Sequence, residues 1–153
     1  MSDVVLREAA EGDVAAILDL YLSAGIADAG FTVDEGREKL AEFRRYPSLR
    51  VFVAEIEGVV VGTYELLIMD NLAKRGARSG VVEDVAVAPA MQGRGVGRAM
   101  MLHAFEQCRR AGCYKLVLSS NAKREEAHRF YESLGFERHG YSFRVVLEPK
   151  GTE

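Results

Sequence analysis

One junction, residues 82–101, limits the folds open to this chain more than any other stretch: "VEDVAVAPAMQGRGVGRAMM". An apolar run rich in valine ends near Pro89, three glycines follow at alternate positions, and a helical pattern begins. A helix N-terminus carries unpaired backbone N–H groups and partial positive charge, and glycines allow a ligand to approach them closely. The junction therefore predicts a strand, a turn at "GRGVGR" and a helix. The turn and the start of the helix are expected to bind an anion of the pyrophosphate type.

The spacing of this turn excludes two common phosphate-binding motifs. It lacks the Gly-Lys-Ser/Thr end of the P-loop, and it does not follow the G-x-G-x-x-G order of the dinucleotide fold. A nucleoside triphosphate and a nicotinamide cofactor are thus not predicted. The structural alternative is a tight turn that merely needs glycine, but three glycines beside Arg94 and Arg98 favour a ligand.

Outside this junction, strand and helix patterns alternate. The order predicts a mixed α/β domain: a central sheet flanked by helices, in one domain over residues 1–153. Asp13 is expected to cap the first helix, and Leu40 and Phe43 to face inward from the second. The expected elements are a strand at 4–9, helices at 11–25 and 32–47, a hairpin at 50–69 that turns at Glu57-Gly58, a strand at 80–87, a helix at 95–111, a central strand at 114–120, a helix at 124–135 and one or more strands within 136–148.

Composition and charge narrow the class of protein. The apolar runs are too short for a bilayer, and the start "MSDVVLREAAEGD" is acidic and unlike a signal peptide, so we expect a cytoplasmic protein without a membrane partner. A net charge of −3 argues against a nucleic-acid partner. Two cysteines, Cys108 and Cys113, predict neither a disulfide framework nor a metal site.

The charges are unevenly distributed along the chain. Residues 1–42 hold 10 acidic and 3 basic side chains, whereas residues 92–130 hold 8 basic and 3 acidic ones. Solvated helix faces account for most of these charges. The polarity still fits a protein that holds a cationic ligand near its first half and an anionic one near its second.

Two segments resemble a known family. The stretch at 82–101 resembles the acetyl-CoA signature of the GNAT-type N-acetyltransferase superfamily, in which a strand is followed by Q/R-x-x-G-x-G/A. Gln92, Gly95 and Gly97 occupy its defining positions. The stretch "NAKREEAHRFYESLGFERHG" resembles the second half of the signature, and the order of elements matches over nearly the whole chain.

The resemblance implies a splayed sheet. The strand at 82–87 would part from the strand at 116–118, with a bulge in the first strand, and pantetheine would lie in the gap. The residues implied to bind acetyl-CoA are Val85, Ala86 and Val87 for pantetheine, Gln92, Gly93, Arg94, Gly95, Val96, Gly97 and Arg98 for the diphosphate, and Asn121 and Phe130 beyond the next strand. A simple turn at the end of that strand is the alternative role for Asn121.

Acetyl transfer to an amine requires a base, because a free alkyl ammonium with a pKa of about 10.4 is not a nucleophile. Glu83 and Asp84 are the candidates, and alternation along a strand places them on opposite faces unless a bulge intervenes. By its position Glu83 resembles the base of polyamine acetyltransferases. The resemblance further implies Tyr131 as the acid for the departing thiolate and a backbone N–H near Val85 for the oxyanion.

The predicted function is acetyl transfer from acetyl-CoA to a primary amine of a small molecule, by direct attack in a ternary complex. The alternatives are acetylation of a protein N-terminus or lysine, and a non-catalytic acyl-CoA sensor. Related folds also pair through C-terminal strands, which allows a homodimer through "SFRVVL". Candidates for the acceptor pocket are Tyr21, Phe31, Tyr64, Glu65, Asp70, Asn71, Tyr141 and Phe143.

Overall fold

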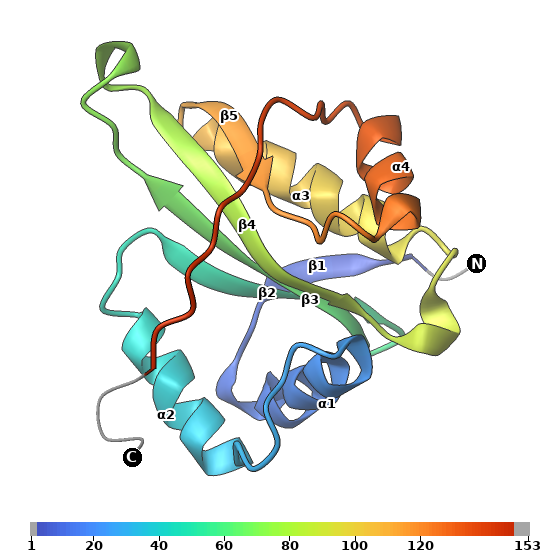
Figure 1. Cartoon of the computed structure of the whole chain (residues 1–153). Helices are drawn as coiled ribbons and strands as arrows, with labels where there is room; N and C mark the ends of the chain where they lie inside the picture. The colour runs from blue at the N-terminus through green and yellow to red at the C-terminus, as the bar shows by residue number, and fades with distance from the viewer. Residues whose placement is uncertain (1–2, 149–153) are drawn as a thin grey trace. The chain divides into compact units, whose positions relative to one another are not determined.

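The computed structural model describes residues 3–148, and it confirms a mixed α/β fold (Figure 1). The described chain divides after Leu118 into two compact units. The elements of the first unit are β1 (Val5–Glu8), η1 (Glu11–Asp13), α1 (Val14–Ala24), α2 (Val33–Phe43), β2 (Leu49–Ile56), β3 (Val59–Met69), η2 (Lys74–Gly76), β4 (Arg78–Val87), η3 (Pro89–Met91), α3 (Val96–Arg110) and β5 (Cys113–Leu118). The second unit holds α4 (Glu125–Ser133).

Five strands form one sheet in the order β1-β2-β3-β4-β5. The first three pairings are antiparallel, and β4 pairs with β5 in parallel. The hairpin of β2 and β3 turns at Glu57 and Gly58 as predicted, with both residues at positive φ, which matches the twist of the flanking strands.

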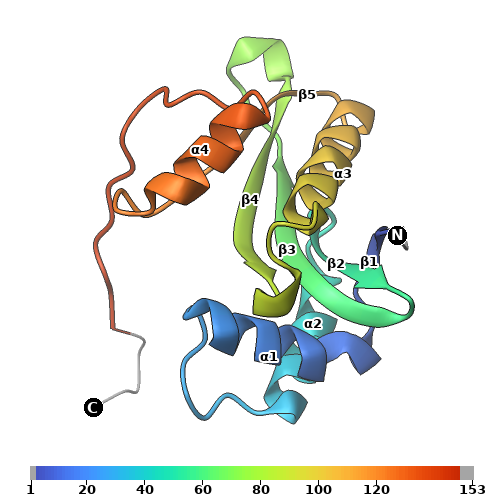
Figure 2. The same cartoon turned by 90° about the vertical axis from the view of Figure 1, so that its right-hand side faces the viewer.

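The two faces of the sheet are covered by different helices of the first unit (Figure 2). On one face α1 and α2 pack over a cluster that contains Ile17, Val51 and Val53, and the predicted inward residues Leu40 and Phe43 join it. On the other face α3 packs so closely that added Cβ atoms on two strand glycines would collide with it. The contacts would be Gly62 with Met100 and Val96, and Gly80 with Cys108.

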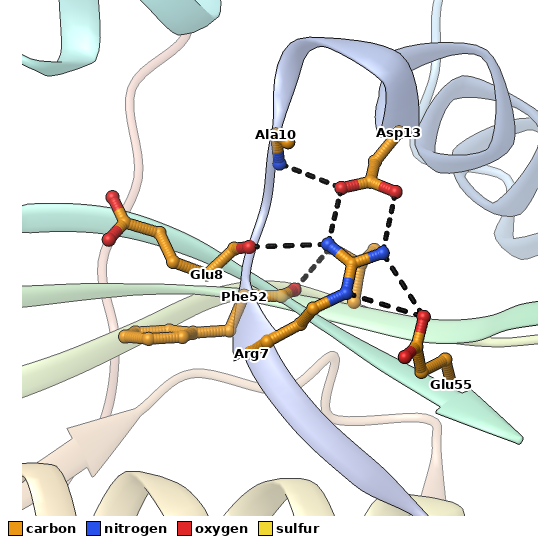
Figure 3. Close-up of polar contacts among 7 residues, drawn as sticks. Arg7, Glu8, Ala10, Asp13, Phe52 and Glu55 are labelled. Atoms are coloured by element: carbon orange, nitrogen blue, oxygen red, sulfur yellow. Dashed lines mark hydrogen bonds and ion pairs between the residues drawn. The ribbon is translucent and has the colours of Figure 1, made fainter. Parts of the chain in front are cut away.

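Arg7 of β1 forms ion pairs with Asp13, just before α1, and with Glu55 of β2 (Figure 3). Its guanidinium donates to both carboxylate oxygens of Asp13, at 2.7 and 2.9 Å, and to Glu55. Asp13 precedes α1 as predicted, but its side chain does not cap that helix. The carboxylate instead accepts from Ala10 N and Arg7, and these contacts hold its pKa below the usual range.

Two predictions about strands are wrong. The segment 136–148 forms no strand, and within the described residues β5 is an edge strand of its sheet rather than a central one. Valine and aromatic residues favour strands, but a strand forms only where its backbone finds a partner. Large side chains stay exposed along this segment, Tyr141 at 92% and Phe143 at 91%, and homodimer pairing through 142–147 stays a prediction.

Candidate functional site

The glycine turn before α3 has the geometry that close approach of a ligand requires. Gly93 and Gly95 adopt φ values of 76° and 85°, and a Cβ added to either would meet no atom within 4 Å apart from its chain neighbours. Packing therefore does not explain these glycines, whereas positive φ does. Gln92 to Gly95 are exposed, and the 15-residue helix α3 begins directly after them. The turn thus presents a helix N-terminus, flanked by Arg94 and Arg98, to solvent.

The sheet opens beside this turn. The parallel pairing of β4 with β5 ends at Val82 and Leu118, although β4 continues on β3 to Val87. Within the described chain, Glu83–Val87 therefore have no strand partner on the β5 side. This opening agrees with the predicted parting of the two strands, and it leaves a free backbone edge at Val85–Val87.

A bulge in β4 brings carboxyl groups together. Asp84 has a φ of 51°, and the register between β3 and β4 shifts there: Thr63 faces Ala86, whereas Glu65 faces Glu83. The predicted bulge is thus confirmed, and it breaks the simple alternation of side chains along the strand. Glu65 of β3 lies directly across from Glu83, and its carboxyl group also feels the charge of Asp84.

This arrangement raises the proton affinity of two carboxyl groups. Burial, followed by the negative charges of Asp84 and Glu83, raises the pKa of Glu65 to about 7. Burial and the charge of Asp84 also raise the pKa of Glu83, whose side chain is more exposed than that of Glu65.

The predicted acceptor residues occupy different settings. Tyr21 of α1 approaches the carboxyl groups, and its phenol pKa is raised by burial and by the charges of Glu65 and Asp84. Phe31 is 47% exposed in the link between α1 and α2, and Asp70 forms an ion pair with Arg78 at 2.9 Å. Tyr141 belongs to the exposed segment of the second unit.

Tyr64 is expected to line the acceptor pocket, but its side chain is fully buried against α3. Its hydroxyl lies 2.6 Å from Nδ1 of His103, and its ring stacks on Phe52. His103 is itself half-buried beside this contact. Tyr64 therefore belongs to the core on the α3 face, opposite Glu65.

In the second unit, Tyr131 packs between two phenylalanines. Its ring centroid lies 5.2 Å from that of Phe130 and 5.7 Å from that of Phe136, and burial raises the pKa of its phenol. Asn121 Oδ1 accepts a hydrogen bond from Lys123 N at 2.9 Å, which is the turn role considered for this residue. The roles of Tyr131, Phe130 and Asn121 in binding and catalysis stay predictions.

Comparison with known proteins identifies the family. The model of the acetyltransferase (GNAT) family matches residues 11–136. The chain belongs to this family. It is 32% identical to the glucosamine 6-phosphate N-acetyltransferase of Trypanosoma brucei brucei over 96% of this chain and 100% of that protein. It is also 32% identical to the L-methionine sulfoximine/L-methionine sulfone acetyltransferase of Salmonella typhimurium, over 87% of this chain and 80% of that protein.

The fold agrees with this membership. A solved structure from Agrobacterium tumefaciens is 34% identical and superimposes with a TM-score of 0.88, covering 94% of this GNAT chain and 99% of that one. The protein is thus an acetyltransferase of the GNAT family, for which acetyl-CoA is the implied donor. The Cβ-free turn at Gly93 and Gly95 and the open edge of β4 fit a ligand that joins an extended arm to a diphosphate.

Two further results concern the described residues only. Within 3–148, no helix has the length and apolar character needed to cross a bilayer. In the same range, no group of three or more histidine, cysteine or acidic side chains is placed to hold a metal ion.

Proposed function

We propose that the protein transfers an acetyl group from acetyl-CoA to the primary amine of a small molecule, by direct attack within a ternary complex. The observation that carries this proposal is the position of Glu83. It follows Val82, the last residue of β4 that pairs with β5, and thus lies where the sheet opens. A base belongs at this point, because the acceptor nitrogen must lose a proton before it attacks.

Each group in the proposal has one task. Acetyl-CoA supplies a thioester whose acetyl group is transferred. The amides from Gln92 to Arg98 and the edge of Val85–Val87 hold it, with Asn121 and Phe130 as further contacts. Glu83 takes a proton from the acceptor ammonium, directly or through one water, while Asp84 stays its alternative. A backbone N–H near Val85 stabilises developing negative charge on oxygen, and Tyr131 donates a proton to the leaving thiolate.

A small acceptor is supported by the relatives. The Trypanosoma brucei brucei and Salmonella typhimurium proteins are named for small molecules that carry an amine. The carboxyl groups of Glu65, Glu83 and Asp84 suit an acceptor that arrives as a cation. Tyr21, Phe31, Asp70 and Tyr141 remain candidates for contacts with it.

The test is release of free CoA thiol from acetyl-CoA across a panel of polyamines, aminosugars, aminophosphonates, amino acids and short peptides. Binding of CoA is measured by calorimetry on the same sample. We expect CoA binding and turnover with at least one class of small amine. Turnover confined to peptides would favour a protein acceptor, and CoA binding without turnover would favour a sensor. Absence of CoA binding would overturn the proposal.

A further inference from the structure

Glu65 is placed to influence the base without being the base. It lies on β3, one strand inward from Glu83, and is less exposed than Glu83. Directly opposite residues on an antiparallel pair have Cβ atoms only about 5 Å apart, and like charges there repel each other. The two carboxyl groups are therefore electrostatically coupled through their position in the sheet.

The bulge at Asp84 tightens this coupling. In a regular strand Asp84 would point to the opposite face from Glu83. At the bulge its φ is 51° and the register shifts, and its negative charge acts on Glu65 across the two strands. A residue other than glycine rarely adopts this conformation, and such strain is found most often at functional sites. The fold thus holds a second and a third carboxyl group beside Glu83.

Within residues 3–148, the charges that shift the pKa of Glu65 are all negative. The titratable groups that face Glu65 are Glu83 and Asp84 from β4 and the Tyr21 phenol from α1. From β2, the residue opposite Glu65 is the apolar Val51, which belongs to the core under α1 and α2. Ionisation of Glu65 therefore adds a negative charge to a partly buried site that already holds others.

We propose that Glu65 is a positioning residue of this site, whose charge governs how strongly the Glu83 carboxylate takes up a proton from the acceptor. The inference rests on the proposed function, since it assigns Glu65 to the same reaction. When Glu65 is ionised, the proton that leaves the ammonium nitrogen arrives on an oxygen of Glu83. The pair then changes from two negative charges to one, which relieves their repulsion.

When Glu65 is already protonated, that relief is lost and Glu83 is the weaker base. Burial and the neighbouring carboxylates raise the pKa of Glu65 to about 7, so this change falls in the neutral range. The rate constant kcat/KM should therefore fall as the pH drops through about 7. An alkyl ammonium has its own pKa near 10.4. Deprotonation of the acceptor therefore changes kcat/KM only at higher pH, and it does so equally in all variants.

The first experiment reads the carboxyl groups directly and needs no substrate. The whole protein is labelled with 13C at the glutamate carboxyl carbons, and the carboxyl shifts are followed against pH in the wild type, Glu65→Gln, Glu83→Gln and the control Glu106→Gln. Glu106 lies on α3, where it pairs with Arg109 and Arg110. We expect the resonance missing in Glu65→Gln to titrate near pH 7 in the wild type. Because coupling is reciprocal, its midpoint should drop in Glu83→Gln and stay unchanged in Glu106→Gln.

The second experiment measures kcat/KM between pH 5 and 9 with the best amine of the panel. Glu65→Gln should lose the limb near pH 7 and be several-fold slower than wild type at pH 8. Glu65→Asp should regain the limb, because it restores a carboxyl group, and Glu106→Gln should match the wild type. A Glu65 resonance that titrates near its ordinary value, or an unchanged limb in Glu65→Gln, would overturn the proposal. Absence of turnover on every amine would instead refute the proposed function, and the first experiment would still decide the state of Glu65.

Discussion

Two glycines at the ends of α3 offer a matched pair of substitutions. Gly95 precedes the helix with a φ of 85°, and Gly112 follows it with a φ of 75°. An added Cβ meets nothing within 4 Å at either position. The substitutions Gly95→Ala and Gly112→Ala therefore impose the same kind of backbone strain without a clash. They differ in one respect: only Gly95 belongs to the turn that we assign to the diphosphate.

The expected loss of stability is similar for both. Holding a residue with a Cβ in the left-handed region costs about 1–2 kcal/mol. For a chain of 153 residues, each kcal/mol lowers Tm by about 2–4 °C, so both variants should lose about 2–8 °C. The expected change in affinity is not similar. On the proposed assignment, a methyl group at Gly95 takes up space that the diphosphate needs, and a loss of about 1.4 kcal/mol weakens CoA binding about tenfold.

Calorimetric titration with CoA, together with thermal unfolding, measures both quantities for the two variants and the wild type. We expect Gly95→Ala to bind CoA at least about tenfold more weakly, and Gly112→Ala to bind within about twofold of wild type. Affinity within about twofold of wild type in both variants, at equal loss of Tm, would refute the assignment of the turn. A similar loss of affinity in both would show that strain, and not the close approach, is responsible.

Two other substitutions test separate parts of the site. Tyr131→Phe keeps the ring contacts with Phe130 and Phe136 but removes the acidic proton. We expect kcat to fall by about 10²-fold or more, while calorimetry finds nearly unchanged CoA affinity. An equal loss of kcat and of CoA affinity would contradict the role of an acid. Glu65→Gln should raise Tm relative to wild type above pH 7. The folded-state pKa of Glu65, about 7, exceeds its ordinary value of 4.5, so wild type loses stability as pH rises between these values and Glu65→Gln does not; a difference in Tm that is the same at pH 4 and pH 8 would contradict this.

Local features of the fold were predictable because neighbours in the sequence determine them. The β2–β3 hairpin follows from Glu57-Gly58 between two β-branched runs. Helix α3 follows from the apolar repeat after Gly95, and the glycines before it indicate a turn at its N-terminus. The family signature covers these local features, so the glycine turn and the parting of the strands near Val82 could also be expected.

The features that depend on partners distant in the sequence could not be predicted in the same way. The pairing of Glu65 with Glu83 is set by the register of β3 and β4 across a bulge, and no local pattern gives that register. Tyr64 is an aromatic residue of the kind that lines pockets. It lies one position before Glu65 on β3, so its side chain points to the opposite face and is buried against α3. The composition of 136–148 favours a strand but does not specify an edge for it to join.

The most direct test of the account is a competition between acceptors in one reaction. Wild-type protein, acetyl-CoA, an equimolar mixture of small primary amines and a set of peptides with free N-termini and lysines are incubated together. Mass spectrometry then follows which molecules gain an acetyl group. The account predicts that a small amine is acetylated first, and that Glu83→Gln acetylates it far more slowly. Peptides acetylated before every small amine would contradict the account.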